Sequence, residues 1–148
     1  MNLILWRHAE AEKSAPDQSR KLTPRGIEQA RKMAAWLNPR LPSGTRVLVS
    51  PAQRTRQTAD ALHIEYTVVD TLYSSTDCES LMQQVDWPEG QGSVLIIGHQ
   101  PTLGELAATI LTGRDDSWEI DPSGLWWFES TPLSGRIRVR AAMSPELL

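Results

Sequence analysis

Three short apolar runs of this sequence each lead into side chains suited to binding or attacking an anion. The runs are residues 3–6, 47–49 and 94–97. Arg7 and His8 follow the first run directly. Arg54 comes shortly after the second run, and His99 follows the third after one glycine. Guanidinium groups hold the oxygens of a dianion in bidentate hydrogen bonds, and a neutral imidazole can attack phosphorus. These residue types together predict a pocket for a dianion, with phosphate as the first candidate.

The runs that precede these side chains have the pattern of buried strands. Each is apolar at successive positions, as in strands that are covered on both faces. Helical patterns follow, with expected starts at Thr23-Pro24, at Ser50-Pro51 and at Pro101. Ligands of open α/β sheets bind outside the carboxyl ends of the parallel strands. We therefore expect the arginines and histidines to gather at one sheet edge, beside the helix N-termini at Pro51 and Pro101, whose unpaired N–H groups favour an anion.

The remaining pattern indicates an α/β fold. The helix after Pro24 is expected to bury an apolar stripe that begins at Ile27, and Gly113 is expected to end the helix after Pro101. A capping box from Thr76 to Glu79 predicts a shorter helix. Further strands are expected at residues 68–69, 124–129 and 136–140. We expect residues 1–148 to form a single three-layer α/β/α sandwich domain with a mostly parallel central sheet.

The composition narrows the class of partner. The 148 residues are 40% hydrophobic and 22% charged, and the net charge is −3, so nucleic acid is not an expected partner. No apolar run has the length of a membrane span, and no signal peptide is evident. Cys78 is the single cysteine, which rules out an intrachain disulfide and suits a reducing compartment. We expect a cytoplasmic protein that does not bind a membrane.

Three motifs of the chain resemble, in the same order, those of the histidine phosphatase superfamily. They are RH at residues 7–8, SPAQRTRQTA at residues 50–59 and GH at residues 98–99. Two further segments, RKLTPRG at residues 20–26 and PSG at residues 122–124, narrow the resemblance to the SixA group of bacterial phosphohistidine phosphatases. The resemblance extends over nearly the whole chain and implies a phosphoglycerate mutase-like fold.

The resemblance also implies catalytic roles for four residues. His8 corresponds to the nucleophile of the family, which forms a covalent phosphohistidine. Arg7 and Arg54 correspond to its phosphate-binding arginines, and His99 corresponds to its second histidine. Arg54 is preferred to Arg56 because it lies in the first turn of the expected helix, whereas Arg56 points to another side. Because the arginines can neutralise the phosphoryl charge, we expect neither a metal ion nor another cofactor.

Two features depart from the family pattern. Ala9 stands where the family usually has glycine, and its methyl group restricts the backbone near the expected phosphate site. Larger relatives also carry a glutamate that acts as general acid. The candidates here are Asp77 and Glu79, but both fit the start of a helix, Glu79 as the partner in the capping box. We interpret them as caps more readily than as acids.

Several other residues have both a structural and a functional interpretation. Arg20 is either a solvated loop charge or a contact to the bound phosphate. Ser123 and Gly124 either supply a backbone donor to the substrate or form a turn. His63 lies near the end of an expected helix, where a partial positive charge is favourable, and we interpret it as structural.

The leading functional hypothesis is a phosphohistidine phosphatase that acts on a histidine-phosphorylated protein. One alternative is a small-molecule phosphomonoesterase of the same fold. Another is an idle phosphate-binding regulatory domain, which Ala9 and the missing acid leave open. The least favoured alternative is a zinc hydrolase, because its potential ligands lack the spacings of zinc sites. Those ligands would be His8, His63, His99 and Cys78.

Overall fold

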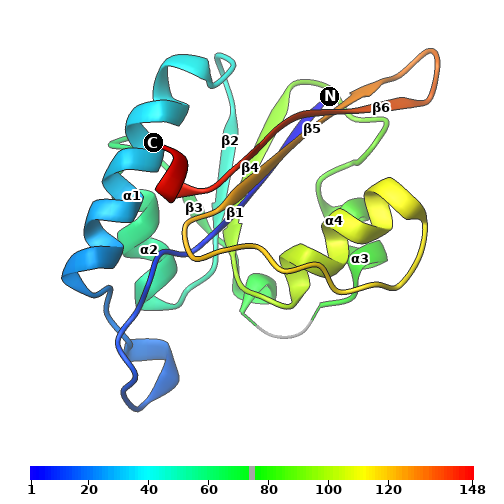
Figure 1. Ribbon diagram of the computed structural model, residues 1–148. Helices are drawn as coiled ribbons and strands as arrows, with labels where there is room; N and C mark the ends of the chain where they lie inside the picture. The colour runs from blue at the N-terminus through cyan, green and yellow to red at the C-terminus, as the bar shows by residue number, and fades with distance from the viewer. Residues whose placement is uncertain (74–75) are drawn as a thin grey trace.

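A single six-stranded sheet forms the centre of the protein, as seen in a computed structural model that describes residues 1–73 and 76–148 (Figure 1). Its strands are β1 (Asn2–Arg7), β2 (Arg46–Val49), β3 (Thr67–Val68), β4 (Ser93–Gly98), β5 (Leu125–Thr131) and β6 (Arg136–Met143). They are arranged in the order β3-β2-β4-β1-β5-β6. The first four strands are parallel, and β5 runs antiparallel to β1 and to β6. The expectation of a mostly parallel sheet is confirmed.

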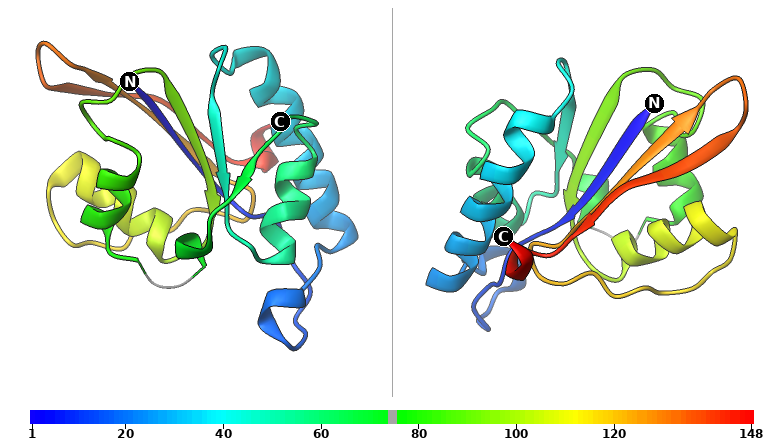
Figure 2. Two further views of the ribbon diagram at one scale, coloured as in Figure 1. Left: turned by 180° about the vertical axis from the view of Figure 1, so that it is seen from behind. Right: turned by 45° about the horizontal axis from the view of Figure 1, so that its top comes forward.

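Helices cover both faces of the sheet, so the expected three layers are present (Figures 1 and 2). The helices are α1 (Pro24–Leu37), α2 (Gln53–Asp60), α3 (Cys78–Gln84) and α4 (Thr102–Thr112). Alternate residues of β1 divide the core between the layers. Ile4 and Trp6 pack in the cluster that includes residues of α1 and α2. Leu3 and Leu5 pack in the cluster that includes residues of α3 and α4.

The helix boundaries agree with the sequence at some positions and differ at others. Thr23 caps α1 as expected, since its Oγ1 accepts the Gly26 N–H at 2.9 Å. Gly113 ends α4 in the left-handed conformation, with φ of 68°. The expected core position of Ile27 is wrong: its exposed fraction is 55%, and the buried stripe of α1 begins at Gly26 and continues through Gln29. Ile27 has the spacing of the expected apolar stripe, but it lies on the exposed side of the helix.

Two expected helix starts also need correction. The N-cap of α3 is Asp77 rather than Thr76, because an oxygen of Asp77 accepts the N–H of Ser80 at 2.8 Å. The capping box that would have used Glu79 is therefore wrong. Helix α2 begins at Gln53, two residues later than the start expected at Pro51. None of the helices in the described part of the chain has the length and apolar character needed to cross a bilayer.

Two glycines next to the expected site differ in the space around them. A Cβ atom at Gly26 would lie 2.0 Å from the carbonyl oxygen of Glu10, whereas one at Gly98 would meet Leu103 at 3.6 Å. We expect Gly26→Ala to lower the free energy of unfolding by ~1–3 kcal/mol, as overpacking does. Gly98→Ala, the matched control, is expected to change it by less than about 1 kcal/mol. Urea unfolding of both variants measures the difference, and equal effects would contradict the packing that we describe.

Candidate active site

The register of the sheet brings the ends of its central strands together. Arg7, the last residue of β1, pairs with Gly98, the last residue of β4, so that His8 and His99 leave adjacent strands side by side. The N–H of His8 donates to the carbonyl of Gly98 at 3.0 Å. Arg54, in the first turn of α2, reaches the same place. A cavity of about 520 Å³ opens there, lined by Arg7, His8, Asp17, Arg20, Arg54, Tyr73, His99 and Gln100.

Hydrogen bonds determine the tautomer of His8. Its Nδ1 lies 2.7 Å from the carbonyl oxygen of Ala9, and a carbonyl only accepts, so Nδ1 carries the proton. Its Nε2 accepts the Nε–H of Arg54 at 3.3 Å and therefore presents a lone pair. Burial, with smaller contributions from the charges nearby, lowers the pKa of His8 to about 3. The imidazole is thus neutral at pH 7, and the nitrogen that carries its lone pair faces Arg54.

His99 has the opposite tautomer. Its Nδ1 lies 3.3 Å from Nη2 of Arg54, which only donates, and its Nε2 lies 2.7 Å from Oγ of Ser50. In the neutral ring the proton is therefore on Nε2 and is donated to Ser50. Burial and the Arg54 charge lower the pKa of His99 to about 4. The two histidine rings meet edge to face, with centroids 5.3 Å apart.

The two expected phosphate-binding arginines are both held by the protein. The side chain of Arg54 is only 7% exposed, and its Nη1 donates to the carbonyl of Asp17 at 2.8 Å. Nη1 of Arg7 donates to the carbonyl of Ile120 at 2.6 Å. Nε of Arg7 is buried without a hydrogen-bond partner within residues 1–73 and 76–148. This N–H is a donor that a bound anion can satisfy.

Two residues that sequence reasoning missed, Asp17 and Tyr73, complete the cavity. Asp17 accepts hydrogen bonds from Nη2 of Arg54 at 3.1 Å, from the Tyr73 hydroxyl at 2.9 Å and from Arg20 at 3.1 Å. Gln100 also lines the cavity, although its amide bonds to α4. Asp17 and Tyr73 lie in loops without periodicity, and the only local signal was the spacing of Asp17 and Arg20. Arg20 is therefore both a cavity residue and a partner of Asp17.

The two helix N-termini offer less to an anion than expected. At α4, the N–H of Gly104 already donates to Oε1 of Gln100 at 2.8 Å. At α2, the N–H of Ala52 points to Oγ of Ser50 at 3.4 Å. Ala9 also directs its amide inward, to Oγ1 of Thr58 at 3.0 Å, and its methyl group is buried. At each of these two helix starts, at least one N–H is thus already engaged within the protein.

The structure uses Ser123 and Gly124 to hold β1 in place. The N–H of Ser123 donates to the carbonyl of His8 at 3.0 Å, and that of Gly124 donates to the carbonyl of Asp121 at 2.7 Å. The indole N–H of Trp6 donates to the Ser123 carbonyl at 3.0 Å. Both expected donor groups are therefore engaged within the protein. The contact of Ser123 with His8 and the hydrogen bond from the Arg7 N–H to the carbonyl of Gly124, at 3.0 Å, hold the end of β1.

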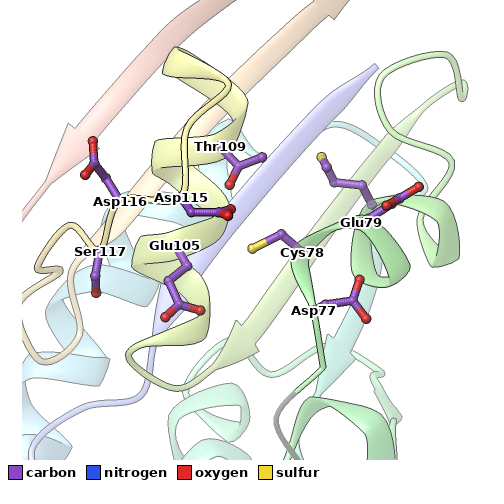
Figure 3. A pocket seen from close by; sticks show the side chains of 9 residues that line it. Asp77, Cys78, Glu79, Glu105, Thr109, Asp115, Asp116 and Ser117 are labelled. Carbon is purple, nitrogen blue, oxygen red and sulfur yellow. The ribbon is translucent and has the colours of Figure 1, made fainter.

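The two candidate acids lie at another place. Asp77 and Glu79 line a separate cavity between α3, α4 and the loop after α4, together with Cys78 (Figure 3). The hydrogen bonds of Ser80 lower the pKa of Asp77, which is the opposite of what a general acid requires. Of the other zinc ligands considered above, His63 lies apart from the cavity, because it is exposed after the end of α2. Within the described residues, no group of three potential ligands could hold a metal ion.

The lowered histidine pKa values predict a pH dependence of stability. His8 and His99 are protonated below about pH 6.5 in the unfolded chain but stay neutral in the folded one, so stability is lost as the pH falls from 6.5 toward 4. Between pH 7 and pH 5 we expect a loss of about 2 kcal/mol per histidine. The His8→Asn variant should lose less stability between the two pH values than the wild type, by the share of His8. The His63→Asn variant changes an exposed residue, so it should lose as much stability as the wild type. Urea midpoints at both pH values measure this, and equal slopes in the two variants would contradict it.

Comparison with known proteins agrees with this geometry. Residues 3–73 match the family model of the histidine phosphatase superfamily, branch 1. The chain is 35% identical to the phosphohistidine phosphatase SixA of Escherichia coli K12, over 77% of this chain and 76% of that one. It is 32% identical to the SixA homolog of Haemophilus influenzae, with coverage of 78% and 80%. The structure of SixA complexed with tungstate superposes with a TM-score of 0.77 at 29% identity, over 99% of each chain. The chain therefore belongs to the histidine phosphatase superfamily and, within it, to the SixA group.

Proposed function

We propose that this protein is a phosphohistidine phosphatase that acts on a histidine-phosphorylated protein through a phosphohistidine formed at His8. The observation that carries the proposal is the neutral His8, whose Nε2 lone pair faces the Arg54 guanidinium inside a cavity lined by a second arginine and a second histidine. Its relatives named above are phosphohistidine phosphatases.

The first step transfers the phosphoryl group to His8. The Nε2 lone pair attacks phosphorus, the bond from phosphorus to the leaving atom breaks, and its electron pair departs with the leaving group. Arg54 and Arg7 hold the phosphoryl oxygens; the unpaired Nε–H of Arg7 suits this role. The Ala9 carbonyl stabilises the ring as it becomes cationic, because it accepts the Nδ1 proton. Water then attacks phosphorus, releases inorganic phosphate and regenerates neutral His8.

The arrangement of carboxyl groups supports a phosphoramidate substrate. Among the cavity residues in the described chain, Asp17 is the one carboxylate, and the hydrogen bonds from Tyr73 and Arg20 lower its pKa to about 2. Asp17 is therefore ionised and cannot donate a proton. An alkoxide leaving group needs a proton as the bond breaks, whereas a phosphoimidazole that is protonated on its distal nitrogen leaves as neutral imidazole. Such a substrate needs no acid from the enzyme.

The proposed reaction proceeds without a metal ion. Arg7 and Arg54 supply positive charge where a metal would otherwise stand. We expect labelled phosphohistidine protein, mixed with the enzyme in EDTA and quenched without acid, to leave label on His8. His8→Asn should carry no label, and His63→Asn should label normally. Label on a serine or on Cys78, or activity that EDTA abolishes and zinc restores, would contradict the proposal.

Substrate preference is a second test. We expect a phosphohistidine protein to be hydrolysed at least about 100-fold faster than glycerol phosphate, since general-acid assistance is typically worth that much. His8→Ala and Arg54→Ala should lower kcat/KM by about 100-fold or more. Asp77→Asn and Glu79→Gln should change it by less than about threefold, because both residues line the other cavity. Equal rates on the two substrates, or a collapse in either carboxylate variant, would indicate a general phosphomonoesterase.

A further inference from the structure

The cavity that holds His8 has an inner and an outer end. His8 and Arg54 lie at the inner end, where the side chain of Arg54 is 7% exposed. Asp17 and Tyr73 lie at the outer end, where the side chain of Asp17 is 53% exposed and the Tyr73 residue is 39% exposed. A charged carboxylate and an aromatic ring thus stand at the mouth, above the buried nucleophile.

Arg54 connects the two ends. Its Nε and Nη2 face Nε2 of His8 and Nδ1 of His99, each at 3.3 Å. Its Nη1 and Nη2 face the carbonyl and the carboxylate of Asp17, at 2.8 and 3.1 Å. The Asp17 carboxylate and the two histidine nitrogens therefore contact the same guanidinium, and Nη2 faces both His99 and Asp17.

Asp17 retains acceptor capacity in this position. A carboxylate has about four acceptor sites, and the hydrogen bonds from Arg20, Arg54 and Tyr73 use three of them. Arg54 and Tyr73 both bind Oδ2, so the free site is on Oδ1, beside the single contact from Arg20. The same contacts keep the group ionised. Asp17 can therefore accept one further hydrogen bond, and it can accept it as an anion.

The geometry of phosphoryl transfer places the leaving group near this site. The attacking and leaving atoms lie roughly in line across phosphorus. Because Nε2 of His8 attacks from the buried end, the leaving group must point toward the mouth. The mouth presents Asp17 together with the ring of Tyr73, which packs edge to face on His99 with centroids 5.9 Å apart. A flat ring that carries a positive charge complements an aromatic face and a carboxylate.

We propose that Asp17 is a specificity-determining residue that binds the protonated distal nitrogen of the leaving imidazole. The inference rests on the function proposed above. The distal N–H donates to Asp17 before cleavage, the bond from phosphorus to the proximal nitrogen breaks as His8 bonds to phosphorus, and imidazole leaves neutral with its distal proton in place. Asp17 thus holds the substrate in its reactive form and disfavours leaving groups that depart as anions.

The decisive measurement is a ratio of two substrates in one enzyme. The ratio is kcat/KM for a phosphohistidine protein divided by kcat/KM for p-nitrophenyl phosphate, whose leaving group departs as an anion. Asp17→Asn is expected to lower this ratio by about 10-fold or more, as the loss of a charged hydrogen-bond partner does. Glu12→Gln removes a charge from the same loop outside the cavity lining, so its ratio should equal that of the wild type.

The outcomes separate the inference from the proposed function. If Asp17 served only to orient Arg54, both substrates would slow in parallel and the ratio would stay constant, which would overturn the inference alone. A wild-type enzyme that does not hydrolyse phosphohistidine would overturn the proposed function and the inference together. An equal fall of the ratio in Glu12→Gln would also overturn the inference, because it would show a general charge effect.

A measurement on the native protein decides the matter if Asp17→Asn does not fold. Asp17 should raise the pKa of the phosphoimidazole ring when the substrate is bound. As the pH rises, the kcat ratio of the two substrates should therefore stay constant until about one pH unit above the pKa of the free ring. The groups that face Asp17 are Arg20, Arg54, Tyr73 and His99. None changes charge between pH 6 and 9, since guanidinium stays protonated, His99 is already neutral and the pKa of Tyr73 is raised. A ratio that falls at the pKa of the free ring would overturn the inference.

Discussion

The guanidinium of Arg54 contacts both histidines and Asp17 at the same time, and the geometry of the cavity depends on it. Because it donates and never accepts, it requires a lone pair on Nε2 of His8 and on Nδ1 of His99. It reaches this position from the first turn of α2, immediately after β2. A lysine there would make a point contact and could not face three partners from one plane. The planar cation therefore sets the protonation pattern on which the proposed attack by His8 depends.

Burial supplies the second feature of the site, a neutral imidazole at His8 beside fixed positive charge. The ends of β1 and β4 lie between two helical layers, so His8 and His99 lose water while the arginines keep their charge. We expect this arrangement to lower the stability of the protein at acidic pH, because the pKa values of both histidines are lowered in the folded chain. The N–H of Ser123, which donates to the carbonyl of His8, helps to hold the end of β1 in place.

Asp17, the one carboxylate among the described residues that line the cavity, connects the proposed reaction with the proposed choice of substrate. A carboxylate held ionised by Arg20 and Tyr73 is unable to protonate an alkoxide. It suits instead a leaving group that brings its own proton. The open position of Asp17, at the mouth, also suits a histidine presented on the surface of another protein. In the function that we propose, the loop of Asp17 therefore bears on both the reaction and the partner.

Local patterns in the sequence determined the buried strands, the cap at Thr23, the stop at Gly113 and the strand-end motifs, because each depends on residues close together in the chain. Periodicity could not tell that Gly26 rather than Ile27 faces the core, since packing decides between neighbouring positions. Only the tertiary structure decided which loop side chains meet. Asp17 and Tyr73 are 56 positions apart, and no local pattern records a hydrogen bond between them. The register of two strands and the path of two loops decide that contact.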